Sequence, residues 1–197
     1  MIKDLNNKIQ DLNNIDEIIK KEKLDIIVVS YGGSCCNILA KTLEKNNYNC
    51  ITPIWKKILC HNGDYINTDI PIIYIYDNPI KSFMSMKRRN EGYWDLNQKK
   101  LSNNNNIELS DENLIKIMIQ QYKNWTNIKR DNILIIKTEE LFQNNITSKL
   151  NKFLNTKIKH FPIKYVAPKT KINNITDKNL ISLFEKYKDD LLEIIKS

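Results

Sequence analysis

The sequence predicts an α/β protein, a three-layer sandwich in which helices cover both faces of a central parallel sheet. Three short apolar runs rich in β-branched residues support this class, at residues 24–30, 71–77 and 132–138. Runs without a polar face are typical of central parallel strands covered by helices, and residues 24–30 are expected to form such a strand. Segments with helical periodicity separate them, and this alternation favours one sheet with parallel strands. The length of 197 residues and the hydrophobic content of 41% fit a single domain.

The helices are predicted from apolar residues that recur at steps of three and four. The first such pattern begins at Ile2 and predicts an amphipathic helix within residues 1–22. Four further helical patterns lie at residues 34–44, 80–89, 111–128 and 139–154. A last helix is expected from Thr176 to Ile195, with Thr176 or Asp177 as its N-terminal cap.

Two segments between these elements are less regular. Residues 54–60 predict a fourth, weaker strand. Residues 90–110 are polar and aperiodic, which predicts a long loop or lid of a kind that is often functional.

The charge of the chain favours an anionic partner. Its 31 Lys and Arg residues exceed its 23 Asp and Glu residues, which gives a formal net charge of +8. Such an excess raises the local concentration of phosphate and sulfate groups. Nucleic acid is the less favoured partner, because Trp55, Trp94 and Trp125 lack the spacing of a base-stacking surface. Trp125 is expected to lie in the core, and the sequence does not specify an oligomeric state.

The sequence predicts a cytoplasmic protein without a bound metal. It begins without a charged-then-apolar leader, and its apolar runs are shorter than the roughly 20 residues that span a bilayer. The four cysteines lack metal-site spacing, which favours free thiols in a reducing compartment. A zinc site at Cys35, Cys36, Cys60 and His61 is disfavoured because adjacent cysteines fit tetrahedral geometry poorly. A nucleophilic Cys35 is disfavoured as well.

Gly32 and Gly33 stand where the first strand turns into a helix, and they are two of only four glycines in the chain. The first amides of a helix lack intrahelical partners and attract anions. Glycines there let a phosphate approach the backbone, and Ser34 is expected to cap the helix. The alternative is that the glycines only form a tight turn. The segment is not a nucleotide-kinase P-loop, because it lacks that motif's lysine and final glycine.

Four stretches, taken in order, resemble the sulfotransferase family. "SYGGSCCNILAKTLE" resembles its 5'-phosphosulfate loop, and "IYDNPIKSFMSMKRR" is similar to its 3'-phosphate motif, with Asn78, Pro79 and Ser85 in register. "YKNWTNIKRDNILIIKTEEL" and "LFEKYKDDLLEII" are similar to a later helix and strand and to the closing helix. The resemblance implies a P-loop NTPase-like (sulfotransferase-like) topology. It also implies sulfonate transfer from 3'-phosphoadenosine 5'-phosphosulfate (PAPS) to a hydroxyl or amine acceptor.

The resemblance also implies the roles of particular residues. PAPS, or its product 3',5'-adenosine bisphosphate, would be bound without a metal by Gly32, Gly33, Ser34, Cys35, Cys36, Asn37, Ser85, Arg88, Arg89 and Lys169. His61 in "LCH" is similar to a family signature that ends in histidine, and it would be the general base. An imidazole with an ordinary pKa of about 6.5 accepts a proton at neutral pH. The alternative is that His61 is a polar loop residue in the turn-like string "HNGD".

Two departures from the family pattern open a different interpretation. Gly33 stands where the family has a Lys or Arg that contacts the donor, and Asp77 replaces the Arg of the 3'-phosphate motif. A missing cation and an added acid both oppose binding of an anionic donor. Compensating charge would come from Lys87, Arg88 and Arg89, or from the segment at residues 167–171 that contains Lys169. The alternative is an inactive relative that binds a nucleotide or another anionic partner.

Overall fold

The computed structural model describes residues 15–50, 61, 63–88, 98–99, 102, 106–159 and 175–197. The predicted strand at residues 54–60, most of the predicted loop at 90–110, and Arg89 and Lys169 lie outside the described residues.

The described sheet consists of three parallel strands, β1 (Ile27–Val29), β2 (Ile72–Tyr76) and β3 (Ile133–Lys137), in the order β1-β2-β3. Ile27 pairs with Ile72, and Tyr74 pairs with Ile135. The three predicted strands and their parallel arrangement are therefore confirmed, each one or more residues shorter than the apolar run that predicts it. The sequence predicts β1 as a central strand, whereas β2 is central here and β1 forms an edge of the described sheet.

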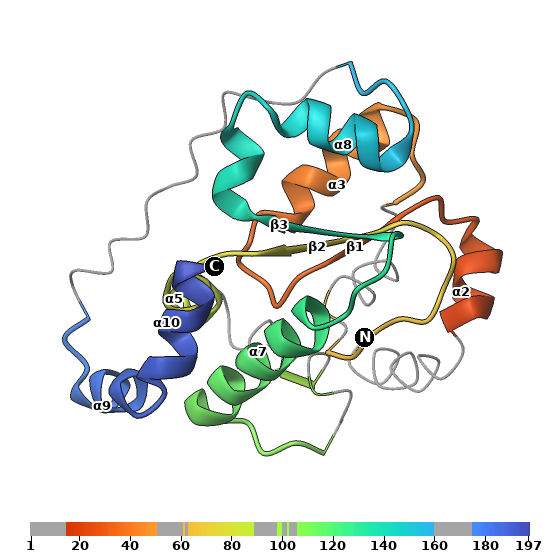
Figure 1. Ribbon diagram of the computed structural model, residues 1–197. Coiled ribbons are helices and arrows are strands. Elements are labelled where there is room, and N and C mark those ends of the chain that lie inside the picture. Colours follow the sequence, from red (N-terminus) through yellow and green to blue (C-terminus); the bar gives the residue numbers. More distant parts are fainter. Residues whose placement is uncertain are drawn as a thin grey trace.

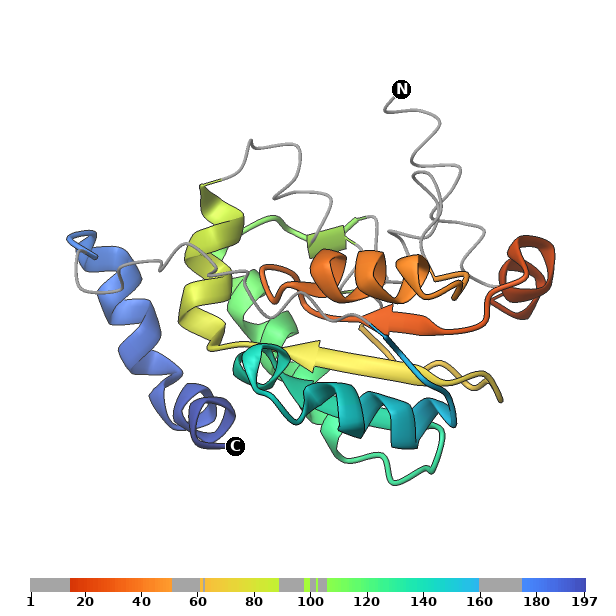
Figure 2. The ribbon, with the colours of Figure 1, turned by 90° about the horizontal axis from the view of Figure 1, so that it is seen from above.

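Helices cover both faces of this sheet (Figure 1). α3 (Cys36–Lys45) and α8 (Ile146–Leu154) lie on one face, and α7 (Asp111–Thr126) lies on the other. α5 (Pro79–Lys87) leaves the carboxyl end of β2 and lies between the sheet and the C-terminal helices, as the view from above shows (Figure 2). α2 (Ile15–Glu22) precedes β1. The α/β class is thus confirmed, and none of the described helices has the length and apolar character needed to cross a membrane.

Two predicted helices are each divided into two. The pattern at residues 139–154 becomes a 3-10 helix, η2 (Thr138–Phe142), followed by α8, because Gln143 is extended. The carboxylate of Glu140 holds this tight turn by accepting a hydrogen bond of 2.9 Å from the Lys137 N–H. The last predicted helix becomes α9 (Lys178–Lys186) and α10 (Lys188–Lys196) with a break at Tyr187. Asp177 caps α9 through the N–H groups of Asn179 and Leu180.

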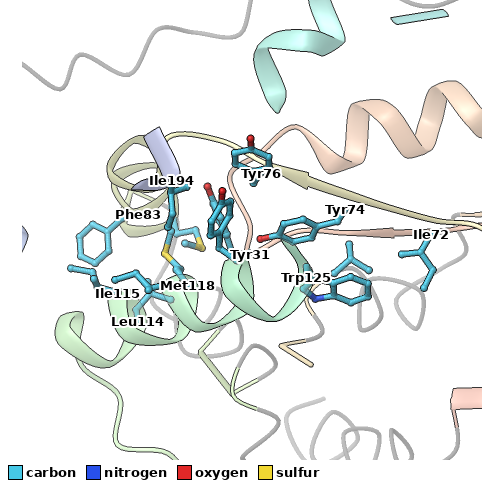
Figure 3. Close-up of a cluster of buried hydrophobic side chains, with 14 of the residues drawn as sticks. Tyr31, Ile72, Tyr74, Tyr76, Phe83, Leu114, Ile115, Met118, Trp125 and Ile194 are labelled. Atoms are coloured by element: carbon cyan, nitrogen blue, oxygen red, sulfur yellow. The ribbon is translucent and has the colours of Figure 1, made fainter. Parts of the chain in front are cut away.

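Alternate residues of the strands divide the core into two halves. Ile72, Tyr74 and Tyr76 face α5, α7 and α10, whereas Ile73 and Ile75 face α3 and α8. Trp125 is fully buried in the first half, as predicted, and its ring stacks on Tyr74 with 5.7 Å between centroids (Figure 3). Burial on both faces explains why β1 and β2 have no polar alternation, whereas β3 is only partly buried.

Candidate functional site

The loop from Ser30 to Cys35 joins β1 to α3 and is fastened at several points. The hydroxyl of the buried Tyr31 donates to the Asp77 carbonyl and accepts from the Asp77 N–H at 2.9 Å. Within the loop, the Gly32 N–H donates to Ser30 Oγ at 3.2 Å, and Ser34 Oγ donates to the Gly32 carbonyl at 3.1 Å. Burial raises the pKa of Tyr31 well above its ordinary value, so this anchor stays protonated. The loop is therefore held against the end of β2.

Both glycines adopt a left-handed backbone, with φ of 97° at Gly32 and 71° at Gly33. A Cβ at Gly33 would lie 2.9 Å from the Cα of Ser82 and 3.0 Å from its carbonyl oxygen. The space beside Gly33 is thus filled by the backbone of α5. The absent side chain at residue 33 serves this close packing, whereas the role predicted from the sequence is to let a phosphate approach the backbone. A Lys or Arg at this position has no room in this backbone arrangement.

The start of α3 differs from the prediction that Ser34 is its cap. The helix begins at Cys36, and its N-cap is Cys35, which has φ of 60° and makes no side-chain capping bond. Ser34 is fully buried, and its hydroxyl is used within the loop. Because Cys35 is left-handed, the chain turns into the helix one residue later than a serine cap would require.

This start leaves backbone donors available at the end of β1. Within the described part of the chain, the N–H groups of Gly33, Ser34 and Asn37 donate to no other group. Gly33 is half-buried, Ser34 is buried and Asn37 is exposed, so the donors run from the interior to the surface. A buried N–H without a partner costs free energy, and bound water or an anionic ligand relieves that cost. Three of the predicted binding residues, Gly33, Ser34 and Asn37, therefore have main-chain N–H groups without a partner among the described residues.

His61 lies directly against this loop. It is only 6% exposed, and its Nδ1 is 2.9 Å from the Ser30 carbonyl oxygen. A carbonyl oxygen only accepts hydrogen bonds, so Nδ1 carries the proton and the neutral ring has its basic lone pair at Nε2. The sequence predicts His61 as a base or as a polar turn residue. The structure places it in the interior, at the carboxyl end of β1.

Two buried polar residues at this end of the sheet are not identified by the sequence analysis. Gln121 of α7 donates from Nε2 to the same Ser30 carbonyl at 3.4 Å. Thr138 Oγ1 lies 3.0 Å from both the Ser34 and the Tyr76 carbonyl oxygens, which ties the loop to the ends of β2 and β3. The available signal for Gln121 was a polar side chain within an otherwise apolar helical row.

The residues after β2 have clear structural roles. The Asn78 side chain caps α5 by accepting from the Ile80 N–H at 3.0 Å and the Lys81 N–H at 3.2 Å, and Pro79 occupies the first turn. Asp77 is partly buried, and this burial raises the pKa of its carboxyl group. The hydrogen bond from the Asn78 N–H, at 2.6 Å, and the charge of Lys81 oppose that rise.

The other residues that the sequence predicts near the donor, as far as the structure describes them, lie on α5 or at its end. Ser85 is half-buried on α5, and Arg88 is exposed as the C-terminal cap of the same helix. Lys87 is engaged elsewhere, because its Nζ lies 2.5 Å from the Asp111 carboxylate. Contact between α5 and the loop is made by Ser82 against Gly33.

Comparisons with known proteins add no relative to this description. The sequence matches no protein-family model, and neither curated proteins nor solved structures provide a significant match. The sulfotransferase resemblance therefore rests on the four sequence motifs.

Proposed function

We propose that the protein binds PAPS, or its product 3',5'-adenosine bisphosphate, on the loop at residues 32–37 and transfers the sulfonate to a hydroxyl or amine acceptor. The observation that carries this proposal is the pairing of His61 with the Ser30 carbonyl beside backbone donors that have no described partner. Ligands of open α/β sheets bind outside the carboxyl ends of parallel strands, which is where these groups lie.

The roles of these groups follow from their chemistry. The N–H groups of Gly33, Ser34 and Asn37 would hold the phosphate oxygens, as helix N-termini do. His61 would take the proton of the acceptor at Nε2, because its Nδ1 already donates to Ser30. Gln121 would hold the same carbonyl in place and so position the imidazole.

Sulfonate transfer in this arrangement is an in-line displacement. The acceptor oxygen or nitrogen forms a bond to sulfur while the bond between sulfur and the bridging phosphate oxygen breaks. The electron pair of that broken bond leaves with the phosphate oxygen, which gives 3',5'-adenosine bisphosphate. The acceptor proton passes to Nε2 of His61, and the imidazolium later releases it to water. The displacement changes no oxidation state, so it needs no oxidant or reductant.

The first experiment is titration calorimetry with 3',5'-adenosine bisphosphate, followed by transfer assays from PAPS carrying a labelled sulfonate to phenol, carbohydrate and peptide acceptors. We expect binding in the micromolar range or tighter and labelled product with at least one acceptor. An absence of heat at millimolar ligand contradicts the proposal.

The variant His61→Asn tests the role of His61 as the general base. An Asn amide can still donate to the Ser30 carbonyl, but it cannot accept the acceptor's proton. We expect kcat to fall by about 10²- to 10⁴-fold while the dissociation constant for 3',5'-adenosine bisphosphate stays within about twofold. Unchanged kcat would remove His61 from the mechanism.

A second candidate function is nucleotide or anion binding without transfer. It is favoured by the backbone of Ser82, which excludes a cation from residue 33, and by the carboxyl group of Asp77 at the end of β2. Within this hypothesis calorimetry shows binding, whereas no acceptor receives label and His61→Asn changes neither result.

A further inference from the structure

The packing at Gly33 raises the question of where positive charge for a bound phosphate would come from. Transfer from a phosphosulfate develops negative charge on the leaving phosphate, and a cation near it lowers the barrier. Residue 33 cannot carry one, because a Cβ there would meet the backbone of Ser82. The helix that blocks this position, α5, is therefore the nearest element that could supply a replacement.

Lys81 immediately precedes Ser82 and lies in the first turn of α5. Its N–H is held by the cap of Asn78. Side chains of an α-helix lean toward the helix N-terminus. Since α5 starts at the carboxyl end of β2 (Figure 2), this geometry predicts that the Lys81 side chain leans toward the edge of the sheet that carries the loop. The charge of Lys81 also opposes the rise in the pKa of Asp77, which directly follows β2.

Ser85 lies on the same side of α5 as Lys81. At about 100° per residue, four residues advance a helix by about 40° beyond a full turn, whereas Ser82 is displaced from Lys81 by about 100°. Ser85 thus points between the direction of Lys81 and the direction of the contact with Gly33. A cation and a hydroxyl therefore border the place where α5 touches the loop.

Within the described residues, the charge of Lys81 acts on the carboxyl group of Asp77 from beyond ion-pair distance. The side chain is partly exposed and makes no ion pair there, whereas Lys87 pairs with Asp111 and Lys123 pairs with Asp190. A cation in the first turn also faces the positive end of the helix dipole, which is an unfavourable place for it. The first turn of α5 contains no acidic residue that would offset this. An anionic ligand at the sheet edge would give this lysine the close ionic partner that Asp77 does not provide.

We infer that Lys81 is a ligand-binding residue that supplies positive charge to a phosphate held on the loop at residues 32–37, in place of a side chain at residue 33. This inference rests on the proposed function, because it concerns the same site. The inference places the positive charge on α5, the helix that packs against Gly33.

The test compares three variants in calorimetry with 3',5'-adenosine bisphosphate. Lys81→Gln removes the charge and should weaken binding by about ten- to a hundredfold, while Lys81→Arg should stay within about threefold of the wild type. Lys178→Gln is the matched control and should bind like the wild type. Lys178 also lies in the first turn of a helix and is exposed, but its helix, α9, lies away from the sheet (Figures 1 and 2).

The outcomes separate this inference from the proposed function. If the wild type binds and Lys81→Gln binds equally well, the assignment of Lys81 is wrong and the proposed function stands. If Lys178→Gln weakens binding as much as Lys81→Gln, the effect is one of general charge and the assignment is also wrong. If the wild type itself gives no heat, both proposals are wrong. Melting temperatures of all variants within about 2 °C of the wild type would show that the fold is retained.

Discussion

Substitution of Gly33 by alanine tests the packing on which the description of the site depends. In the native arrangement the new Cβ would lie 2.9 Å from the Ser82 Cα and 3.0 Å from its carbonyl oxygen. Both are backbone atoms, so they cannot move aside as a flexible side chain would. The residue would also keep φ near +71°, which favours glycine over alanine.

The two effects can be given rough magnitudes. The left-handed backbone costs about 1–2 kcal/mol for a residue with a Cβ. Overpacking costs about 1–3 kcal/mol, and the lower entropy of the unfolded alanine chain offsets about 0.4–1 kcal/mol. A net loss of about 2–3 kcal/mol corresponds to a fall in melting temperature of about 4–12 °C for a chain of this size.

Asn47→Ala is the control for backbone conformation. Asn47 has φ of 68°, nearly that of Gly33, but it is exposed. Its substitution should cost about 1 kcal/mol and lower the melting temperature by about 2–4 °C. Differential scanning calorimetry at pH 7 measures both variants. If the melting temperatures of Gly33→Ala and Asn47→Ala fall by the same amount, then α5 does not fill the space beside Gly33. In that case residue 33 has room for a side chain, and Lys81 is not needed in its place.

Two further variants test other contacts. Tyr31→Phe removes the hydroxyl that both donates to and accepts from the main chain of Asp77, so the free energy of unfolding should fall by about 1–3 kcal/mol. Urea denaturation measures this, and wild-type stability would contradict the anchor. Hydrogen bonds from Lys186, Tyr187 and Lys116 lower the pKa of Glu112 from its ordinary 4.5 to about 2. A lowered pKa gives stability that is present above pH 4.5 and is lost as the pH falls to about 2. The melting temperature of Glu112→Gln should therefore be below that of the wild type near neutral pH and converge with it toward pH 2; a constant difference would contradict this contact.

The regular elements were predictable because their signals are local. Apolar runs such as residues 71–77 identify a buried strand by composition, and apolar residues at steps of three and four identify α7. The breaks within two predicted helices were not predictable. Gln143 is extended after the turn held by Glu140, and Tyr187, at the other break, donates its hydroxyl to Glu112, which is 75 residues away in sequence. A contact of this kind leaves no periodic signal in the sequence.

The candidate site likewise combines features that the local sequence predicts with features that depend on contacts between distant residues. The sequence by itself determined that a glycine-rich turn follows the first strand, and it identified His61 as the residue to examine. Only the tertiary structure decided that Ser82 fills the space at Gly33, that Cys35 and not Ser34 precedes α3, and that Gln121 and Thr138 reach the loop across 91 and 104 residues. The physical reason is that periodicity reports which face of a segment avoids water. The partner of a buried polar group is known only when the segments are packed together.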